Sequence, residues 1–193
     1  MIHRPSITEV CLIFTLPRLS ERTKYIINKQ PRLSIEELTS DHPDWQEFVA
    51  LVNEVNPEGW AFNPYFEQFS RYFLAAKQDR TIVGFLMFVV WDIGPHDRDH
   101  PPLQIHGKML KEAKILAFGV KDGYRRQGIG TALQEYTIKQ AKLFDCYQVR
   151  SVSGENHPEN HHLKLFIGFA VEPMERDEKC LAFVMPLKST TEK

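Results

Sequence analysis

Residues 115–133, ILAFGVKDGYRRQGIGTAL, join an apolar run to a basic, glycine-rich turn and then to a segment of helical periodicity. Ile115 to Val120 carries no charge, which predicts a buried strand. The apolar residues after the turn share one side of a 3.6-residue helix: Ile129, Leu133, Tyr136, Leu143 and Phe144. The stretch therefore predicts a strand, a loop and a helix, with Gly128 and Gly130 in the first helical turn.

Two glycines at the start of a helix are costly unless something must approach the backbone closely. The unbonded N–H groups of a first helical turn attract anions, and Arg125 and Arg126 add positive charge beside them. The loop lacks the Gly-Lys-Ser/Thr ending of a P-loop. It also lacks the third glycine of a dinucleotide-binding turn, because Leu133 occupies that position. An anion site of another kind remains, with a ligand-free glycine-rich turn as the alternative.

The pattern Arg125-x-x-Gly128-x-Gly130 after a strand resembles the acetyl-CoA pyrophosphate loop of the GCN5-related N-acetyltransferase (GNAT) family. In that family a strand ending in Val, a short turn, this loop and a long helix follow one another. This chain shows the same order of elements between Lys114 and Phe144. The resemblance covers roughly residues 32–187.

Hydrophobic patterns along the rest of the chain predict the other elements. Strands are expected at 32–38, 72–76, 81–91, 147–153, 169–172 and 180–187, and helices at 44–55 and 159–167. Pro158 fits the first position of the later helix and Gly168 its C-terminal stop. The order predicts an α/β domain. The resemblance implies a mixed, mostly antiparallel central sheet flanked by helices, with splayed fourth and fifth strands. Residues 1–30 are expected to form an arm, 31–188 the acetyltransferase-like domain and 189–193 a tail.

The composition is typical of a globular protein, because 42% of the 193 residues are hydrophobic and 25% are charged. A formal net charge of −1 gives no reason to expect binding to nucleic acid or to an anionic membrane. The three cysteines, Cys11, Cys146 and Cys180, are odd in number and lack paired metal-ligand spacing. Reduced thiols and a cytoplasmic location are therefore expected.

The resemblance implies that acetyl-CoA is the acyl donor and that backbone groups hold it. In the family, the pantetheine amides bind the exposed edge of the fourth strand, and N–H groups of the loop bind the pyrophosphate. The residues implied here are Phe118, Gly119, Val120, Arg125, Arg126, Gln127, Gly128, Ile129, Gly130, Thr131 and Asn156. Gly119 within a strand is compatible with a bulge or a close ligand, and also with plain packing.

Acyl transfer to an amine needs a base for the ammonium group and an acid for the departing thiolate. In the resembled family the acid is a tyrosine on the helix that precedes a Gly-Phe pair. Here Gly168-Phe169 is that pair, Leu163 takes the family's Leu position, and Lys164 stands where the tyrosine is expected. The ammonium group of Lys164 could donate the proton, and an exposed surface lysine is the alternative. The candidate bases are Glu112, Asp92 and His106, each of which also suits a solvated loop.

Two segments are expected to shape the acceptor pocket. Residues 60–69, WAFNPYFEQF, carry five aromatic side chains, which suit either core packing or a substrate lid. The candidate substrate residues are Trp60, Tyr65 and Trp91. Residues 92–111 form a long polar insertion, which the resemblance places at the acceptor end of the site. The histidines of the chain show no convincing ligand set, so no metal is expected.

The resemblance implies an N-acetyltransferase that moves an acetyl group from acetyl-CoA to a primary amine of a small molecule or peptide by direct attack on the thioester. A homodimer is compatible with it. The alternative is a non-catalytic acyl-CoA-binding sensor or interaction module, because the family's tyrosine is missing and no clear base is visible.

Overall fold

The computed structural model describes residues 32–56, 59–94, 101–174 and 179–187. The predictions for residues 1–30 and 189–193 lie outside the described residues, as does part of the 92–111 insertion. Among the helices in these ranges, none has the length and apolar character needed to cross a membrane.

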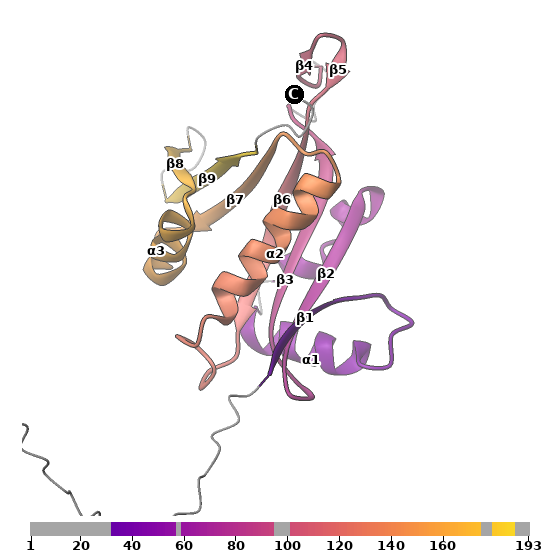
Figure 1. The fold of residues 1–193 in the computed structure, drawn as a ribbon, viewed down its shortest axis with the longest axis vertical. Coiled ribbons are helices and arrows are strands. Elements are labelled where there is room, and N and C mark those ends of the chain that lie inside the picture. The colour runs from indigo at the N-terminus through magenta and orange to yellow at the C-terminus, as the bar shows by residue number, and fades with distance from the viewer. Residues whose placement is uncertain (1–31, 57–58, 95–100, 175–178, 188–193) are drawn as a thin grey trace, which may run out of the picture. The chain divides into compact units, whose positions relative to one another are not determined.

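Figure 1 shows the elements in chain order. The strands are β1 (Leu33–Leu38), β2 (Ser70–Gln78), β3 (Thr81–Asp92), β4 (Gln104–Ile105), β5 (Lys108–Met109), β6 (Lys111–Val120), β7 (Gln148–Gly154), β8 (Ala170–Pro173) and β9 (Cys180–Pro186). The helices are α1 (Trp45–Val55), α2 (Ile129–Leu143) and α3 (Pro158–Ile167), with short 3-10 helices η1 (Trp60–Phe62) and η2 (Pro64–Gln68). The strands and helices predicted for residues 32–187 are confirmed, with bounds shifted by a few residues.

The main sheet has seven strands in the order β1-β2-β3-β6-β7-β9-β8. The pair β6–β7 is parallel, and the other neighbouring pairs are antiparallel. These two strands are the predicted fourth and fifth strands. The predicted fold class, a mixed and mostly antiparallel sheet flanked by helices, is confirmed.

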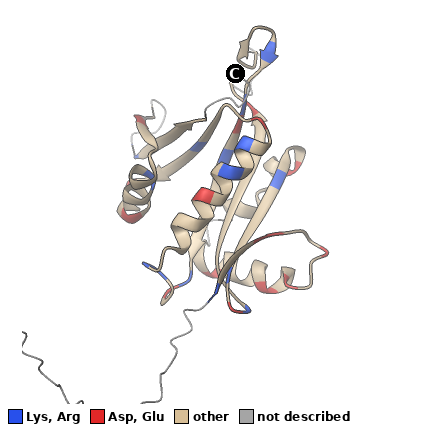
Figure 2. Ribbon diagram, viewed as in Figure 1, with Lys and Arg blue, Asp and Glu red and all other residues tan. Residues whose placement is uncertain are grey.

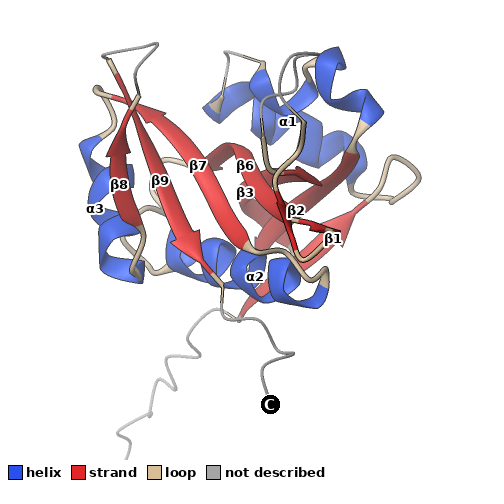
Figure 3. Cartoon of the chain, turned by 90° about the horizontal axis from the view of Figure 1, so that it is seen from above, coloured by secondary structure: helices blue, strands red, loops and turns tan. Residues whose placement is uncertain are grey.

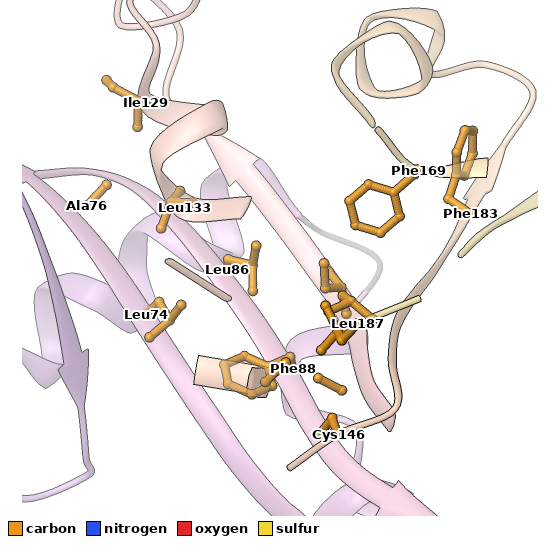
Figure 4. Close-up of a cluster of buried hydrophobic side chains, with 14 of the residues drawn as sticks. Leu74, Ala76, Leu86, Phe88, Ile129, Leu133, Cys146, Phe169, Phe183 and Leu187 are labelled. Atoms are coloured by element: carbon orange, nitrogen blue, oxygen red, sulfur yellow. The ribbon is translucent and has the colours of Figure 1, made fainter. Parts of the chain in front are cut away.

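The sheet separates two apolar layers. α1, η1 and η2 pack on one face, where Phe48, Leu51 and Val52 of α1 are buried. α2 packs on the opposite face, and α3 lies beyond β7 on that same side (Figure 3). Figure 4 shows Ile129 and Leu133 of α2 above β2 and β3, with Phe169 and Phe183 at the α3 end of the same cluster.

The prediction that Leu143 lies on the buried side of α2 is wrong, because its side chain is 70% exposed. The inward row of this helix continues from Leu133 through Thr137 to Ala141, one residue every four. Leu143 lies two residues beyond Ala141, which is about 200° further around the helix. It therefore points away from the sheet.

The insertion contains a short hairpin that the sequence analysis did not predict. β4 and β5 pair antiparallel, and the turn between them is His106-Gly107 with φ values of 51° and 78°. Two consecutive positive φ angles are the geometry of a type I′ turn. Each strand has only two residues, which is too short for an alternating pattern to be recognised.

A buried lysine links three elements at the β1 edge of the sheet. Lys77 Nζ of β2 lies 2.5 Å from Glu36 Oε2 of β1 and 2.6 Å from Asp44 Oδ2, immediately before α1. Glu36, His42 and Asp44 are close enough together to hold a metal ion. The ammonium group of Lys77 already supplies a cation between the two carboxylates, so this cluster is explained as a support of the fold.

Candidate active site

β6 and β7 separate after a short paired stretch. Their pairing runs from Glu112 opposite Gln148 to Ile115 opposite Ser151. From Leu116 to Val120, β6 pairs with no described residue on the β7 side. Residues 117 to 120 remain paired with β3 on the other edge. The two strands are therefore splayed toward the end at which β6 enters the glycine-rich loop.

A β-bulge lies where the splay begins. Met87 of β3 pairs with Ala117 and the next residue, Phe88, pairs with Ile115, so Leu116 is the extra residue on β6. Gly119, for which a bulge was one interpretation, is instead a packing glycine. A Cβ at this position would lie 2.8 Å from Val55 of α1 and 2.9 Å from the Phe85 ring.

The loop after β6 presents a run of unbonded backbone N–H groups. Within the described residues, no hydrogen bond is donated by the N–H groups of residues 125–131, and the first bonded N–H after them is that of Ala132. Arg126 and Gly128 have positive φ angles of 64° and 81°. Alternation of left- and right-handed residues turns successive N–H groups toward one side, which forms an anion-binding concavity.

Gly128 is the N-cap of α2, so its predicted place in the first helical turn is corrected by one position. A Cβ on Gly128 would meet no atom within 4 Å, so the space beside this residue is open. Arg125 folds back along the loop: its Nε donates to Val120 O at 3.2 Å, and its guanidinium lies 3.0 Å from Asp122. These residues and Gln127, which is also exposed, border the N–H groups.

Three elements converge at Gly130 in the first turn of α2. A Cβ there would lie 3.0 Å from the Phe118 ring of β6 and 3.1 Å from Leu163 of α3. A larger residue at this position would require the Phe118 and Leu163 side chains to shift. The contact places α3 beside both the loop and the splayed half of β6.

Lys164 of α3 is buried, with a side chain only 1% exposed. The alternative of an exposed surface lysine is therefore wrong. Its Nζ lies 4.9 Å from the centre of the Phe183 ring of β9, and in the described structure it forms no hydrogen bond or ion pair. Burial lowers the pKa of Lys164 from 10.5 to about 7. A lysine with this pKa can give up and regain a proton near neutral pH.

The register of the sheet places Lys164 at the level of the splay. Phe183 pairs with Ser151, and Ser151 pairs with Ile115, the last residue of β6 bonded to β7. Lys164 thus lies over the row of residues at which the two strands separate, on the α2 side of the sheet. Asn156, proposed as a cofactor residue, lies exposed in the turn before α3.

Of the three candidate bases, Glu112 is the buried one, with 4% exposure. Its Oε1 accepts a 2.7 Å hydrogen bond from Trp91 Nε1, and its Oε2 accepts a 2.6 Å hydrogen bond from Gln148 Nε2. Asp92 lies one row further from the splay, opposite Lys111. His106 lies in the exposed turn of the β4–β5 hairpin. The structure therefore does not bring the three together.

We expect Glu112→Ala to lower the free energy of unfolding by about 2 to 4 kcal/mol, because the buried Trp91 donor and the half-buried Gln148 donor would lose their acceptor. Urea unfolding followed by fluorescence measures this change, with the exposed Glu135→Ala of α2 as the control. An unchanged urea midpoint would contradict the supporting role of this carboxylate. A large loss of activity in Glu112→Gln with little loss of stability would instead identify a base.

The aromatic segment 60–69 divides into core and surface residues. Phe62 stacks on Phe73, and Phe66 lies beside Trp91, so these side chains pack the α1 face. Trp60 and Tyr65 are about half exposed. Core packing thus suits Phe62 and Phe66, and a substrate lid suits Trp60 and Tyr65, which a ligand could reach. Trp91 of β3, the third candidate substrate residue, is largely enclosed.

Two basic residues at the splay were not among the predicted site residues. Lys114 of β6 and Arg150 of β7 are direct cross-strand partners in the row before the last bonded one. Strand alternation could have assigned a face to each residue. Their pairing depends on the register between distant strands, which one sequence does not supply.

The comparisons with known proteins agree with this geometry. The sequence matches the Acetyltransferase (GNAT) family over residues 36–169. No curated protein matches it significantly. Solved structures share the fold at low sequence identity. A GNAT family acetyltransferase from Elizabethkingia anophelis with acetyl-CoA bound has a TM-score of 0.54 and 18% identity, over 80% of this chain and 98% of the other.

Two further similar structures come from other bacteria. The Bacillus subtilis acetyltransferase in complex with CoA has a TM-score of 0.57 and 14% identity, over 81% of this chain and 100% of the other. The ribosomal-protein-S18-alanine N-acetyltransferase from Escherichia coli has a TM-score of 0.57 and 14% identity, over 83% of this chain and 97% of the other. With the family match over most of the sheet, the loop and α3, the chain belongs to the GNAT family of acetyltransferases.

Proposed function

We propose that this protein is an acetyl-CoA-dependent N-acetyltransferase that acts on a primary amine of a small molecule or peptide. The observation that carries this proposal is the continuous run of unbonded N–H groups at residues 125–131, at the start of α2 and directly after a splayed strand. A pyrophosphate matches such a run, because its oxygens accept several hydrogen bonds and its charge is favoured at a helix N-terminus.

The residues proposed for the donor lie along one continuous path. The N–H groups of Arg126, Gln127, Gly128, Ile129, Gly130 and Thr131 would bind the pyrophosphate, with the Arg125 and Arg126 side chains near its charge. The unpaired edge of β6 at Phe118, Gly119 and Val120 would bind the pantetheine amides in the manner of an added strand. Asn156, in the turn before α3, remains a proposed contact on the opposite side of the splay.

The reaction forms a C–N bond between the amine and the acetyl carbonyl carbon and breaks the C–S bond of the thioester. The thiolate that leaves must take up a proton, and the amine must lose one. Lys164 is the residue we propose as the proton donor, because it lies at the level of the splay and its pKa is lowered to about 7 by burial. After donating its proton it becomes neutral, the form that burial favours.

The base is proposed to be Glu112 or Asp92. Glu112 lies on the α1 face with Trp91, and Asp92, the residue after Trp91 in β3, lies on the opposite face by strand alternation. Glu112 lies three residues before the splay, about 10 Å along the strand, and Asp92 lies further away. Both oxygens of Glu112 already accept hydrogen bonds from protein side chains, so we propose that a proton from the amine reaches it through water. Trp60, Tyr65 and Trp91 are proposed to border the acceptor on the α1 face.

Acetyl-CoA is expected to raise the melting temperature by about 5 to 10 °C when its concentration is 100 times its dissociation constant. Release of the CoA thiol with a panel of amino acids, polyamines, aminoglycosides and short peptides then measures transfer. No shift at millimolar acetyl-CoA would overturn the proposed donor. A shift without turnover for any amine would favour the alternative, a non-catalytic acyl-CoA sensor.

A further inference from the structure

Two positive charges face each other on the acceptor side of the splay. Lys114 of β6 and Arg150 of β7 are directly opposite in the parallel pair, so their side chains leave the sheet on the same face. Lys114 Nζ lies 4.7 Å from the centre of the Trp91 ring, which fixes that face as the α1 side. Like charges on directly opposite residues destabilise a sheet, and the Trp91 ring compensates Lys114 alone, so an anionic group beside the pair would be stabilising.

Among the described residues of the chain, no anionic group is bonded to the pair. Neither Lys114 nor Arg150 forms an ion pair or a side-chain hydrogen bond there. The acidic side chain nearest to them in the sheet is Glu112, whose two oxygens already accept from Trp91 and Gln148. Burial lowers the pKa of Lys114, Glu112 opposes this shift, and Arg150 adds to it. Within the described part of the chain, the Glu112 carboxylate is thus the acidic group beside the two cations, Lys114 and Arg150.

The pair lies on the α1 face of the sheet, where Lys114 and Arg150 are both half-buried. Figure 3 shows α1 on one side of the sheet, over the part that holds β1 to β6, and α2 and α3 on the opposite side, where α2 packs against β1, β2, β3, β6 and β7. Val152, two residues after Arg150, is also half-buried on the α1 face. In Figure 2, basic segments are visible on both β6 and β7. A ligand that enters from the α1 side would meet both cations beside the splay.

We propose that Lys114 and Arg150 bind an oxyanion carried by the acceptor, so that the preferred substrates are amines with a carboxylate or phosphate group near the amine. This rests on the proposed acetyltransferase function and names its substrate class. The guanidinium group of Arg150 offers paired N–H donors that match a carboxylate or phosphate, and Lys114 adds a point charge. The pair lies one row from Ile115, where the strands separate, so a short spacer would place the amine at the splay.

The test compares matched acceptors that differ only in charge. Glycine and L-aspartate are compared with glycinamide and L-asparagine, and phosphoethanolamine is compared with ethanolamine, in thiol-release assays at constant ionic strength. We expect kcat/KM to be at least about tenfold higher for the anionic member. The carboxylate and phosphate arms identify which oxyanion is preferred. Equal or higher kcat/KM for the neutral amines would overturn the proposal while leaving the acetyltransferase function intact.

The variants Lys114→Met and Arg150→Met test the two residues themselves. Each is expected to reduce the preference for the anionic acceptor about tenfold. Lys111→Met, on the exposed start of the same strand, is the control for the change in net charge. An unchanged preference in both Lys114→Met and Arg150→Met would contradict the site.

A binding measurement keeps the proposal testable if no amine is turned over. Succinate and inorganic phosphate are each titrated against sodium chloride of equal ionic strength, and the melting temperature is recorded. We expect the oxyanions to raise it by a few degrees in the wild type and in Lys111→Met, and by less in the other two variants. An equal rise in all four proteins would overturn the site. If acetyl-CoA does not raise the melting temperature of the wild type, that result counts against the proposed acetyltransferase function and not against the oxyanion site.

Discussion

Lys164→Met is expected to raise the melting temperature at pH 6 to 7 by about 5 to 10 °C and to lower acetyl transfer about 100-fold. The gain in stability follows from the cost of burying an ammonium group beside Phe183 with no ion pair. A pKa lowered from 10.5 to about 7 corresponds to a cost on the order of several kcal/mol. Methionine fills a similar volume without a charge.

The pH dependence of this gain has a defined sign. Below about pH 7 both the folded and the unfolded chain hold the Lys164 proton, so the full cost of the buried charge is present. Between about pH 7 and 10.5 only the unfolded chain holds it, and the cost falls as pH rises. The advantage of the methionine variant should therefore be largest at pH 7 and below and shrink toward pH 10. Thermal unfolding at several pH values measures this.

Two further variants separate the proton-donor role from a packing role. Lys164→Tyr supplies a hydroxyl donor and is expected to retain more activity than Lys164→Met. Lys142→Met, on the exposed last turn of α2, is the control for the lost charge. In the wild type, kcat should fall as pH rises above about 7, and this fall should be absent in Lys164→Met. Full activity of Lys164→Met, or a lower melting temperature, would contradict the assignment.

Local signals account for the parts of the fold that were predicted correctly. Pro158 begins α3 and Gly168, with φ of 106°, ends it, because each residue has a backbone preference that acts without tertiary contacts. The strand, loop and helix around Gly128 are local in the same sense. The splay between β6 and β7 followed only from the resemblance to the family, since strand pairing is not visible in a single sequence.

The burial of Lys164 could not have been predicted from periodicity. α3 places Lys164 inward and leaves Phe166 83% exposed, which reverses the usual distribution of polar and apolar side chains. The orientation of the helix is set by the contact of Leu163 with Gly130 and by Phe183 beneath it. The opposed charges of Lys114 and Arg150 depend on register in the same way. Residues that depart from hydrophobic patterning are thus the ones that the sequence analysis assigned least well.

Gly128→Glu is expected to remove the rise in melting temperature that acetyl-CoA produces, with at least a 100-fold loss of affinity. The new carboxylate would stand beside the N–H groups of residues 125–131, where it competes with the pyrophosphate for donors and repels its charge. The space beside Gly128 is open, so steric clash does not account for the expected effect. Thermal unfolding with and without acetyl-CoA, and calorimetric titration, measure the loss.

The chain offers a matched control at Gly107 in the turn between β4 and β5. Gly107 has φ of 78° against 81° for Gly128, and neither Cβ would meet an atom within 4 Å. Glutamate at either position therefore adds one negative charge and a similar backbone strain of about 1 to 2 kcal/mol. Both variants should melt at similarly lowered temperatures without ligand, and only Gly107→Glu should keep the acetyl-CoA shift. Only Gly128 lies at the N-terminus of α2. Equal acetyl-CoA shifts in the two variants would therefore show that the donor binds elsewhere.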